Sequence, residues 1–139
     1  IINYQWGCPA MDDLFLHDSL DTSPIVSSKR VLYTPTSFAK SALLYLQEIG
    51  SLQAEQPHIS SRTHLSSYLF FCVNSGEGKL DYHGKTYKLT AGDSAFIDCQ
   101  QPYSHSTSTD LWSLSWIHFS GVTMQDIYQK YLQQVRQHW

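Results

Sequence analysis

The segment from Gly76 to His105, GEGKLDYHGKTYKLTAGDSAFIDCQQPYSH, constrains the fold more than any other part of the chain. Apolar and polar residues alternate on both sides of a short central turn, which is the pattern of a β-hairpin. Gly92 and Asp93 then favour a sharp corner before the apolar run at residues 95–97. We therefore predict the second half of a small β-barrel, with any functional site inside that barrel.

The composition is that of a globular protein. The 139 residues suffice for one domain with its own core, and an aromatic share of 14% suits an interior lined by rings. With a formal net charge of −3, the chain has no basic face that would neutralise a run of phosphates. No apolar run approaches the ~20 residues of a membrane span. We expect a soluble protein that binds neither DNA nor a membrane by itself.

The cysteines predict a reducing compartment. Cys8, Cys72 and Cys99 are odd in number, and none is spaced as in a CxxC motif. We expect them to be reduced, with Cys72 and Cys99 as small core residues, in a cytoplasmic protein.

The chain divides into four regions. Residues 1–34 show no sustained period and contain two prolines, which favours an arm with one or two short strands. Residues 35–50 predict a flanking helix, because apolar residues recur at helical spacing and Gly50 suits a helix end. Residues 51–121 predict the barrel. Residues 122–139 predict a final helix, which packs either on its own barrel or against a second subunit.

Two stretches predict strands of the barrel. The run Tyr68–Val73 is apolar on both faces, which suits a central strand. The run Trp112–Phe119 alternates, so one of its two faces should line the interior. One face carries Trp112, Leu114, Trp116 and His118, and the other carries Ser113, Ser115, Ile117 and Phe119.

A resemblance to a known family rests on two strings, RTHLSSYLFFCVNSGEGKLDYHGKTYKLTAGDSAFIDCQQPYSH and WSLSWIHFSG. They resemble the N-terminal sensor domain of AraC-type transcription regulators, and the resemblance covers roughly residues 60–121. The resemblance implies a mainly β fold, the cupin or double-stranded β-helix (jelly-roll) barrel, with flanking α-helices. It also implies a small effector, often a sugar, held in the barrel of a homodimer. Promoter DNA would bind only through a C-terminal helix-turn-helix domain that this chain lacks.

A metal-dependent cupin isomerase or dioxygenase is the alternative. In metal-dependent cupins the ligands follow the pattern H-x-H, then a glutamate, then a later histidine. Aligned by resemblance on this chain, the four ligand positions fall on Arg62, His64, Leu69 and His105. Arginine keeps its proton and leucine has no donor atom, so two of the four ligands are missing. We therefore expect no metal, no cofactor and no catalytic residue.

The same positions suit a small polar ligand. The guanidinium of Arg62 presents a rigid fork of donors for two hydroxyls or a carboxylate. The indole of Trp116 can lie against the C–H face of a sugar ring, while the histidines offer hydrogen bonds. The predicted ligand-binding residues are Arg62, His64, His105, Trp112, Leu114 and Trp116.

These residues also have structural alternatives. Arg62 would instead pair with an acid such as Asp98, Trp116 would belong to the core, and His64 would be an ordinary polar residue. Asp93 is expected to cap its own turn. If the protein's own rings fill the interior, a third hypothesis applies, namely a dimerisation module without a ligand.

Overall fold

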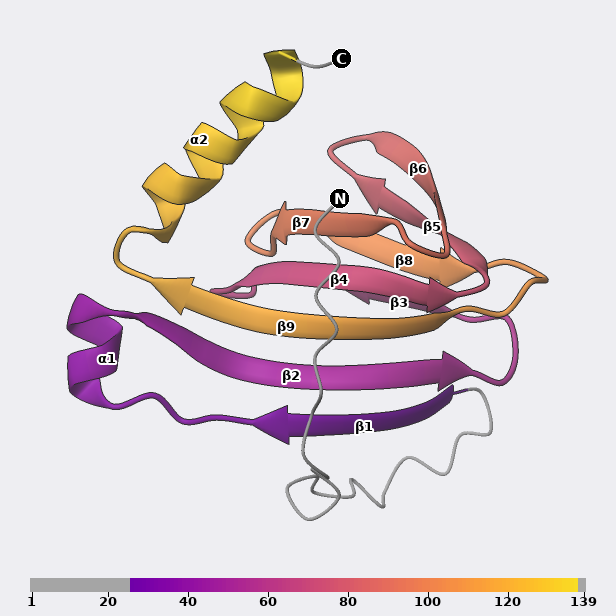
Figure 1. Ribbon diagram of the computed structural model, residues 1–139, viewed down its shortest axis with the longest axis horizontal. Coiled ribbons are helices and arrows are strands. Elements are labelled where there is room, and N and C mark those ends of the chain that lie inside the picture. Colours follow the sequence, from indigo (N-terminus) through magenta and orange to yellow (C-terminus); the bar gives the residue numbers. More distant parts are fainter. Residues whose placement is uncertain (1–25, 138–139) are drawn as a thin grey trace.

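The computed structural model describes residues 26–137 and places their strands in two antiparallel sheets (Figure 1). Residues 1–25 of the predicted arm, with Cys8, lie outside the described residues. The elements are, in chain order, β1 (Val26–Leu32), α1 (Ser37–Ala42), β2 (Leu44–Ala54), β3 (Ile59–Arg62), β4 (Tyr68–Ser75), β5 (Glu77–Tyr82), β6 (Lys85–Thr90), β7 (Ser94–Asp98), β8 (Tyr103–Thr107), β9 (Ser113–Gly121) and α2 (Met124–Gln137).

The sheet order is that of a jelly-roll barrel. The larger sheet has the order β1-β2-β9-β4-β7 and the smaller sheet the order β3-β8-β5-β6. Strand β9 lies between β2 and β4, so the last strand joins two strands from much earlier in the chain. The predicted mainly β fold is confirmed.

The core lies between the two sheets and is rich in aromatic rings. Trp112 is fully buried, and its ring meets that of Phe71 with centroids 6.5 Å apart. The face of β9 that carries Leu114, in line with Trp112 just before the strand, is therefore the interior one. The buried cluster comprises Ala54, Leu69, Phe71, Val73, Leu80, Tyr82, Leu89, Ile97, Cys99, Tyr103, Trp112 and Leu114.

The helix predicted at residues 35–50 is wrong beyond Ala42. Thr36 does start a helix, since its Oγ1 accepts a hydrogen bond from the amide of Ala39 at 3.1 Å. The chain then forms β2, which pairs with both β1 and β9. Pairing along both edges outweighs the local helix propensity of this stretch. The barrel accordingly starts earlier than residue 51.

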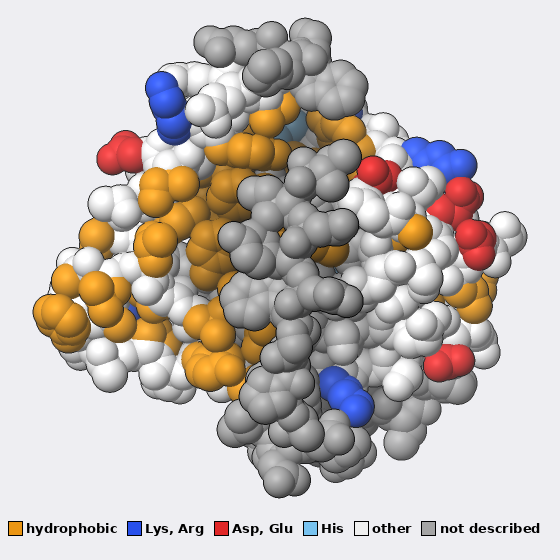
Figure 2. All heavy atoms as spheres, viewed as in Figure 1, with side chains coloured by type: hydrophobic (Ala, Val, Ile, Leu, Met, Phe, Trp, Pro, Cys, Tyr) orange, Lys and Arg blue, Asp and Glu red, His pale blue; other side chains and the backbone are white. Residues whose placement is uncertain are grey.

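Helix α1 covers none of the core. None of its residues is buried, and Phe38 is 68% exposed. Leu43 and Leu44, which follow the helix, are also exposed, and Leu44 lies opposite Gly121 in β9. Figure 2 shows hydrophobic side chains gathered at this end of the sheet. We call Phe38, Leu43, Leu44 and Val122 the apolar end patch.

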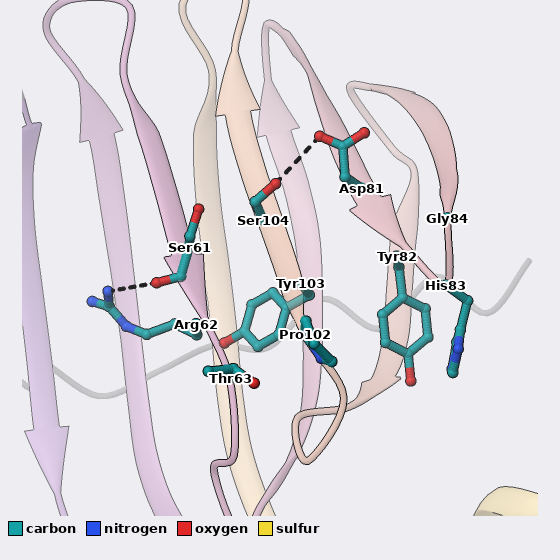
Figure 3. A pocket seen from close by; sticks show the side chains of 10 residues that line it. All are labelled: Ser61, Arg62, Thr63, Asp81, Tyr82, His83, Gly84, Pro102, Tyr103 and Ser104. Carbon is teal, nitrogen blue, oxygen red and sulfur yellow. Dashed lines mark hydrogen bonds between the residues drawn. The ribbon is translucent and has the colours of Figure 1, made fainter.

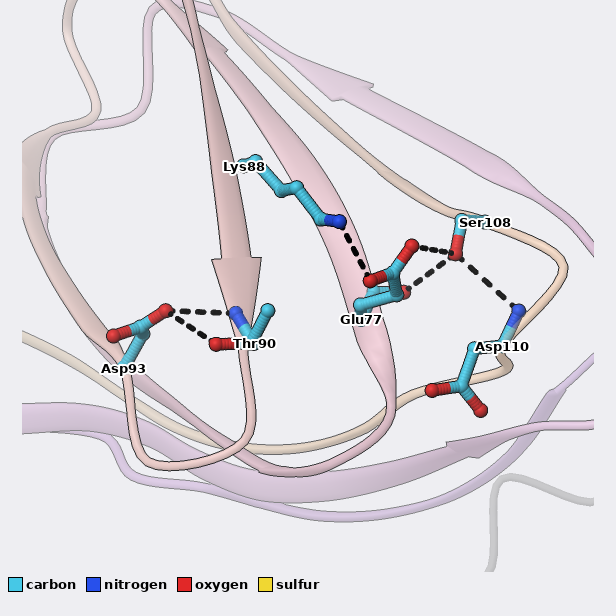
Figure 4. A network of polar contacts seen from close by, with 6 residues as sticks. All are labelled: Glu77, Lys88, Thr90, Asp93, Ser108 and Asp110. Carbon is cyan, nitrogen blue, oxygen red and sulfur yellow. Dashed lines mark hydrogen bonds and ion pairs between the residues drawn. The ribbon is translucent and has the colours of Figure 1, made fainter.

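The predicted hairpin and corner are confirmed. Strands β5 and β6 pair from Glu77↔Thr90 to Tyr82↔Lys85, and the two turn residues between them have positive φ angles, 52° for His83 and 71° for Gly84. At the corner, Asp93 Oδ2 accepts hydrogen bonds from the amide of Thr90 at 2.8 Å and from its hydroxyl at 3.0 Å (Figure 4). Asp93 thus caps its own turn.

A second polar network ties the hairpin to the loop before β9. Lys88 Nζ lies 2.9 Å from Glu77 Oε2, and the hydroxyl of Ser108 donates to Glu77 Oε1 at 3.2 Å (Figure 4). These contacts, Lys88 first, lower the pKa of the Glu77 carboxyl. The network fixes the end of the smaller sheet.

Helix α2 packs on its own barrel, which is one of the two alternatives for the C-terminal segment. Met124 and Tyr128 are buried against Tyr68, with Phe96 and Phe119 beside them. The hydroxyl of Tyr128 lies 3.2 Å from that of Tyr82 in β5. Neither helix of the described residues is long and apolar enough to cross a membrane.

Replacing Gly78 by alanine should destabilise the fold. An added Cβ would lie 2.5 Å from the Trp112 ring and 2.5 Å from the carbonyl oxygen of Ser106, and the fully buried ring has little room to move. Overpacking of this kind costs about 1–3 kcal/mol. Urea unfolding measures the loss, with Lys79→Ala on the exposed side of β5 as the control, expected within about 0.5 kcal/mol of wild type. Equal stability of the two variants would contradict the packing described.

Candidate functional site

Polar side chains gather near the end of β3, partly inside the barrel and partly at its open edge. Strand pairing places Arg62 opposite Tyr103, and Glu48 opposite His118. Paired residues share a face of their sheet, and Tyr103 belongs to the buried core, so Arg62 starts on the interior side. His105 lies two residues beyond Tyr103 on the same face. We call Glu48, Arg62, Tyr103, His105 and His118 the interior polar cluster.

Glu48 holds the indole of Trp116. The Nε1–H of Trp116 donates to Glu48 Oε1 at 2.7 Å, a short bond to a charged acceptor. The ring also lies against Gly50, where an added Cβ would be 2.4 Å from it. The hydrogen bond and the close approach together fix the orientation of the ring.

His118 is held by Ser67 and borders a buried thiol. Its Nδ1 lies 3.0 Å from the hydroxyl of Ser67 and 4.0 Å from Cys99 Sγ. Burial lowers the pKa of His118; Arg62 lowers it further and Glu48 opposes the shift. Burial raises the pKa of the Cys99 thiol to about 11, so this sulfur is protonated near neutral pH. Among the described residues, Cys72 and Cys99 form no disulfide; Cys99 is a core residue as predicted, whereas Cys72 is only partly buried and lies outside the core cluster.

His105 is a neutral, incompletely bonded histidine. Its ring lies 5.9 Å from that of Trp112 and 6.4 Å from that of His58, measured between centroids. Burial, followed by the effects of His58 and Arg62, lowers the pKa of His105 to about 4. Among the described residues, the buried Nδ1 atoms of His58 and His105 have no hydrogen-bond partner. An unsatisfied buried polar atom costs about 1–3 kcal/mol, so a ligand that bonds it gains affinity.

The structure brings together three of the six predicted site residues. Arg62, His105 and Trp116 all belong to the interior region or its edge. Arg62 is exposed at the end of its strand, and its Nη1 donates to the carbonyl of Ser61 at 3.2 Å. It is thus positioned at the open edge of the interior polar cluster.

The other three predicted residues lie elsewhere. His64 is exposed in a left-handed conformation, with φ 57°, and bonds Thr63 Oγ1 at 2.9 Å. Strand β3 ends at Arg62, so the alternation that would turn His64 inward stops before it. Trp112 and Leu114 are 0% and 3% exposed and belong to the core. Because both side chains are buried, they pack in the core and cannot contact a ligand directly.

Sequence reasoning missed several members of this region. Glu48 falls within the helix predicted at residues 35–50, and a helix there gives no sign that Glu48 faces the barrel interior. Tyr103 lies two positions before His105, and His118 two positions after Trp116, so the period of the strands was the available signal. His58 precedes β3 and has no motif to mark it.

An open pocket of about 460 Å³ lies at the same end of the smaller sheet (Figure 3). In it, the hydroxyl of Ser104 donates to Asp81 Oδ2 at 3.2 Å. Figure 3 shows the Arg62 side chain directed away from this pair, although Arg62 also lines the pocket. The lining residues are Ser61, Arg62, Thr63, Asp81, Tyr82, His83, Gly84, Pro102, Tyr103 and Ser104.

The four positions aligned with the ligands of metal-dependent cupins do not come together as a metal centre in the described residues. Across residues 26–137, no three His, Cys, Asp or Glu side chains are grouped so as to hold a metal ion. Of the four positions aligned with metal ligands, His64 faces solvent and Leu69 is buried in the core. Arg62 brings a permanent positive charge to the third.

The chain belongs to the cupin family. The Cupin domain family matches residues 50–120, slightly more than half of the chain. The predicted cupin barrel is therefore confirmed. No curated protein is similar enough in sequence to count as a relative.

Solved structures show the same fold at low sequence identity. The cupin domain of an XRE family transcriptional regulator from Enterobacter cloacae is 17% identical, with a TM-score of 0.52 over 69% of this chain and 98% of that one. Ectoine synthase from P. lautus is 12% identical, with a TM-score of 0.55 over 88% and 84%. An HTH_3 family transcriptional regulator from Vibrio cholerae is 18% identical, with a TM-score of 0.47 over 66% and 49%. This chain thus spans about half the length of the Vibrio cholerae regulator.

The free energy of unfolding should rise with pH between about 4 and 6.5. His105 has a pKa of about 4 in the folded protein and an ordinary value near 6.5 when unfolded, so the unfolded chain binds more protons in this window. The contribution is on the order of 3 kcal/mol, complete above the unfolded value and lost as pH falls.

Urea unfolding across this pH range measures the effect. His105→Gln should flatten the profile, leaving the smaller slope due to His118, whose pKa is lowered in the same direction. An unchanged profile in His105→Gln would show that His105 is not the group responsible.

Proposed function

We propose that this cupin domain is the effector-binding domain of an AraC-type transcription regulator, with a small polar ligand bound at the interior polar cluster. The observation that carries the proposal is the pair of buried Nδ1 atoms, on His58 and His105, that lack partners beside the cation of Arg62. These groups are arranged to receive hydrogen-bonding atoms from a ligand.

The chemistry of the cluster supports binding without reaction. His105 is neutral near pH 7 and offers one donor and one acceptor, and Arg62 adds a fork of donors. The Cys99 thiol stays protonated and buried, so it is a poor nucleophile. Trp116, fixed by Glu48, supplies a flat apolar surface of the kind that contacts a sugar ring.

The regulator part of the proposal draws on the sequence resemblance and on one structural neighbour. The Enterobacter cloacae structure is named as the cupin domain of a transcriptional regulator, so a barrel of this shape serves in such proteins. In the proposed cytoplasmic regulator, promoter DNA is bound by a C-terminal helix-turn-helix domain outside this chain. Ligand binding shifts the protein between two arrangements, for which a difference of ~1–3 kcal/mol suffices.

A homodimer is part of this proposal. The apolar end patch exposes large apolar side chains, including Phe38 and Leu44, outside any contact within the barrel core. Exposed patches of this kind commonly mark interaction surfaces.

A dimerisation module without a ligand is the second candidate. The rings of Tyr82, Tyr103 and Trp112 occupy the space between the sheets and leave that part of the interior filled. In this case the unsatisfied histidine nitrogens would have no ligand to bond. Calorimetry separates the two candidates.

Replacing Arg62 by methionine should weaken ligand binding at least about tenfold, a loss of ~1.4 kcal/mol, because the fork of donors is removed. Isothermal titration calorimetry with a panel of mono- and disaccharides and small polar metabolites measures the affinities. Lys40→Met, an exposed change on α1, is the matched control and should bind as wild type does. Failure of every panel member to bind, or equal binding by Arg62→Met, would refute the assignment.

A further inference from the structure

We infer that the ligand of this site is zwitterionic, a small molecule whose carboxylate meets Arg62 and whose ammonium group meets Glu48, as in an α-amino acid. The inference rests on the proposed function, because it names the chemical class of ligand for the same site. It differs from the sugar suggested by the family resemblance.

The two charges come from opposite sheets. Glu48 lies on β2 of the larger sheet, opposite His118, and Arg62 ends β3 of the smaller sheet, opposite Tyr103. Glu48 is directed inward, since its carboxylate accepts the bond from the interior indole of Trp116. A ligand between the sheets therefore meets an anion on one side and a cation on the other.

Both charges act on the same interior groups. Burial has the largest effect on both groups, lowering the pKa of His118 and raising that of Tyr103, while Glu48 raises and Arg62 lowers the pKa of each. The electrostatic influence of Glu48 and Arg62 thus overlaps at His118 and Tyr103. Within the described residues, the two charged groups do not form an ion pair with each other.

Each charged group keeps bonding capacity for a ligand. Arg62 has five N–H donors, of which Nη1 bonds the Ser61 carbonyl, and Glu48 has a second carboxylate oxygen beside the one that holds Trp116. The indole face of Trp116 adds a cation–π contact for an ammonium group. Neutral His105 can donate its N–H to the carboxylate.

Charge balance selects among small polar ligands. A simple anion would meet repulsion from Glu48, and a simple cation would meet repulsion from Arg62. A neutral sugar would cover the partly buried Glu48 carboxylate and the exposed Arg62 guanidinium without neutralising either, so some of their hydration would be lost without compensation. A zwitterion compensates both charges at once, so it gains where the other classes lose.

The experiment compares matched ligands by isothermal titration calorimetry. The panel holds the common α-amino acids, the N-acetyl derivative and the amide of each, and the sugars used above. At least one amino acid should bind, and its N-acetyl and amide derivatives should each bind about tenfold more weakly or worse, because each lacks one charge.

Two variants assign the contacts. Glu48→Gln keeps an oxygen for the Trp116 N–H, so the ring stays fixed, but it should bind the amino acid and its N-acetyl derivative almost equally. Arg62→Met should likewise lose the preference for the amino acid over its amide. Thermal unfolding of both variants checks that the fold is retained.

The outcomes separate the two proposals. Sugars that bind while amino acids do not would overturn the zwitterion and leave the proposed function standing. Binding of an amino acid with no loss in its N-acetyl derivative or amide would also overturn it. No binding by any member of the panel would refute the zwitterion and the receptor function together.

Discussion

The packing of Trp112 between the two sheets is the constraint on which the rest of the structure depends. Its fully buried ring fills the space above Gly78 and touches the rings of Phe71 and His105. Its amide donates to Thr107 Oγ1 at 3.2 Å, and its carbonyl accepts from Ala54. One residue thereby connects β9 to β2, β5 and β8, and it fixes the spacing at which β2 and β8 face each other.

That spacing determines the chemistry of the interior. Burial keeps His105 neutral and, with a pKa of about 4, a weak base, and it keeps the Cys99 thiol protonated near neutral pH. The charges that remain, Glu48 and Arg62, stand at the edge of the core, where part of their hydration is retained. These features are consistent with the proposed effector-binding function.

The sequence predicted those parts of the fold that local chemistry specifies. The hairpin turn at Gly84 and the corner at Asp93 need only their own residues, and both are found. Strand β2 was missed because its partner β9 lies far along the chain; the Glu48–Trp116 bond spans 68 positions. The same error hid Glu48, one of the five residues of the interior polar cluster. The prediction that His64 lies in the site is wrong for a different reason. Strand β3 ends at Arg62 and His64 is left-handed, so the strand alternation on which the prediction relied stops before it.

The placement of Arg62 on β3 also suggests how binding is transmitted. This strand is short, lies at the edge of the smaller sheet and pairs only with β8 among the described strands. Glu48, in contrast, lies on β2, which is paired on both sides. A ligand that bridges the two residues would tie a weakly held edge strand to a well-held one. Because β3 is paired along one edge only, it has more conformational freedom to lose than β2. Ligand binding should therefore order mainly β3 and the chain on either side of it.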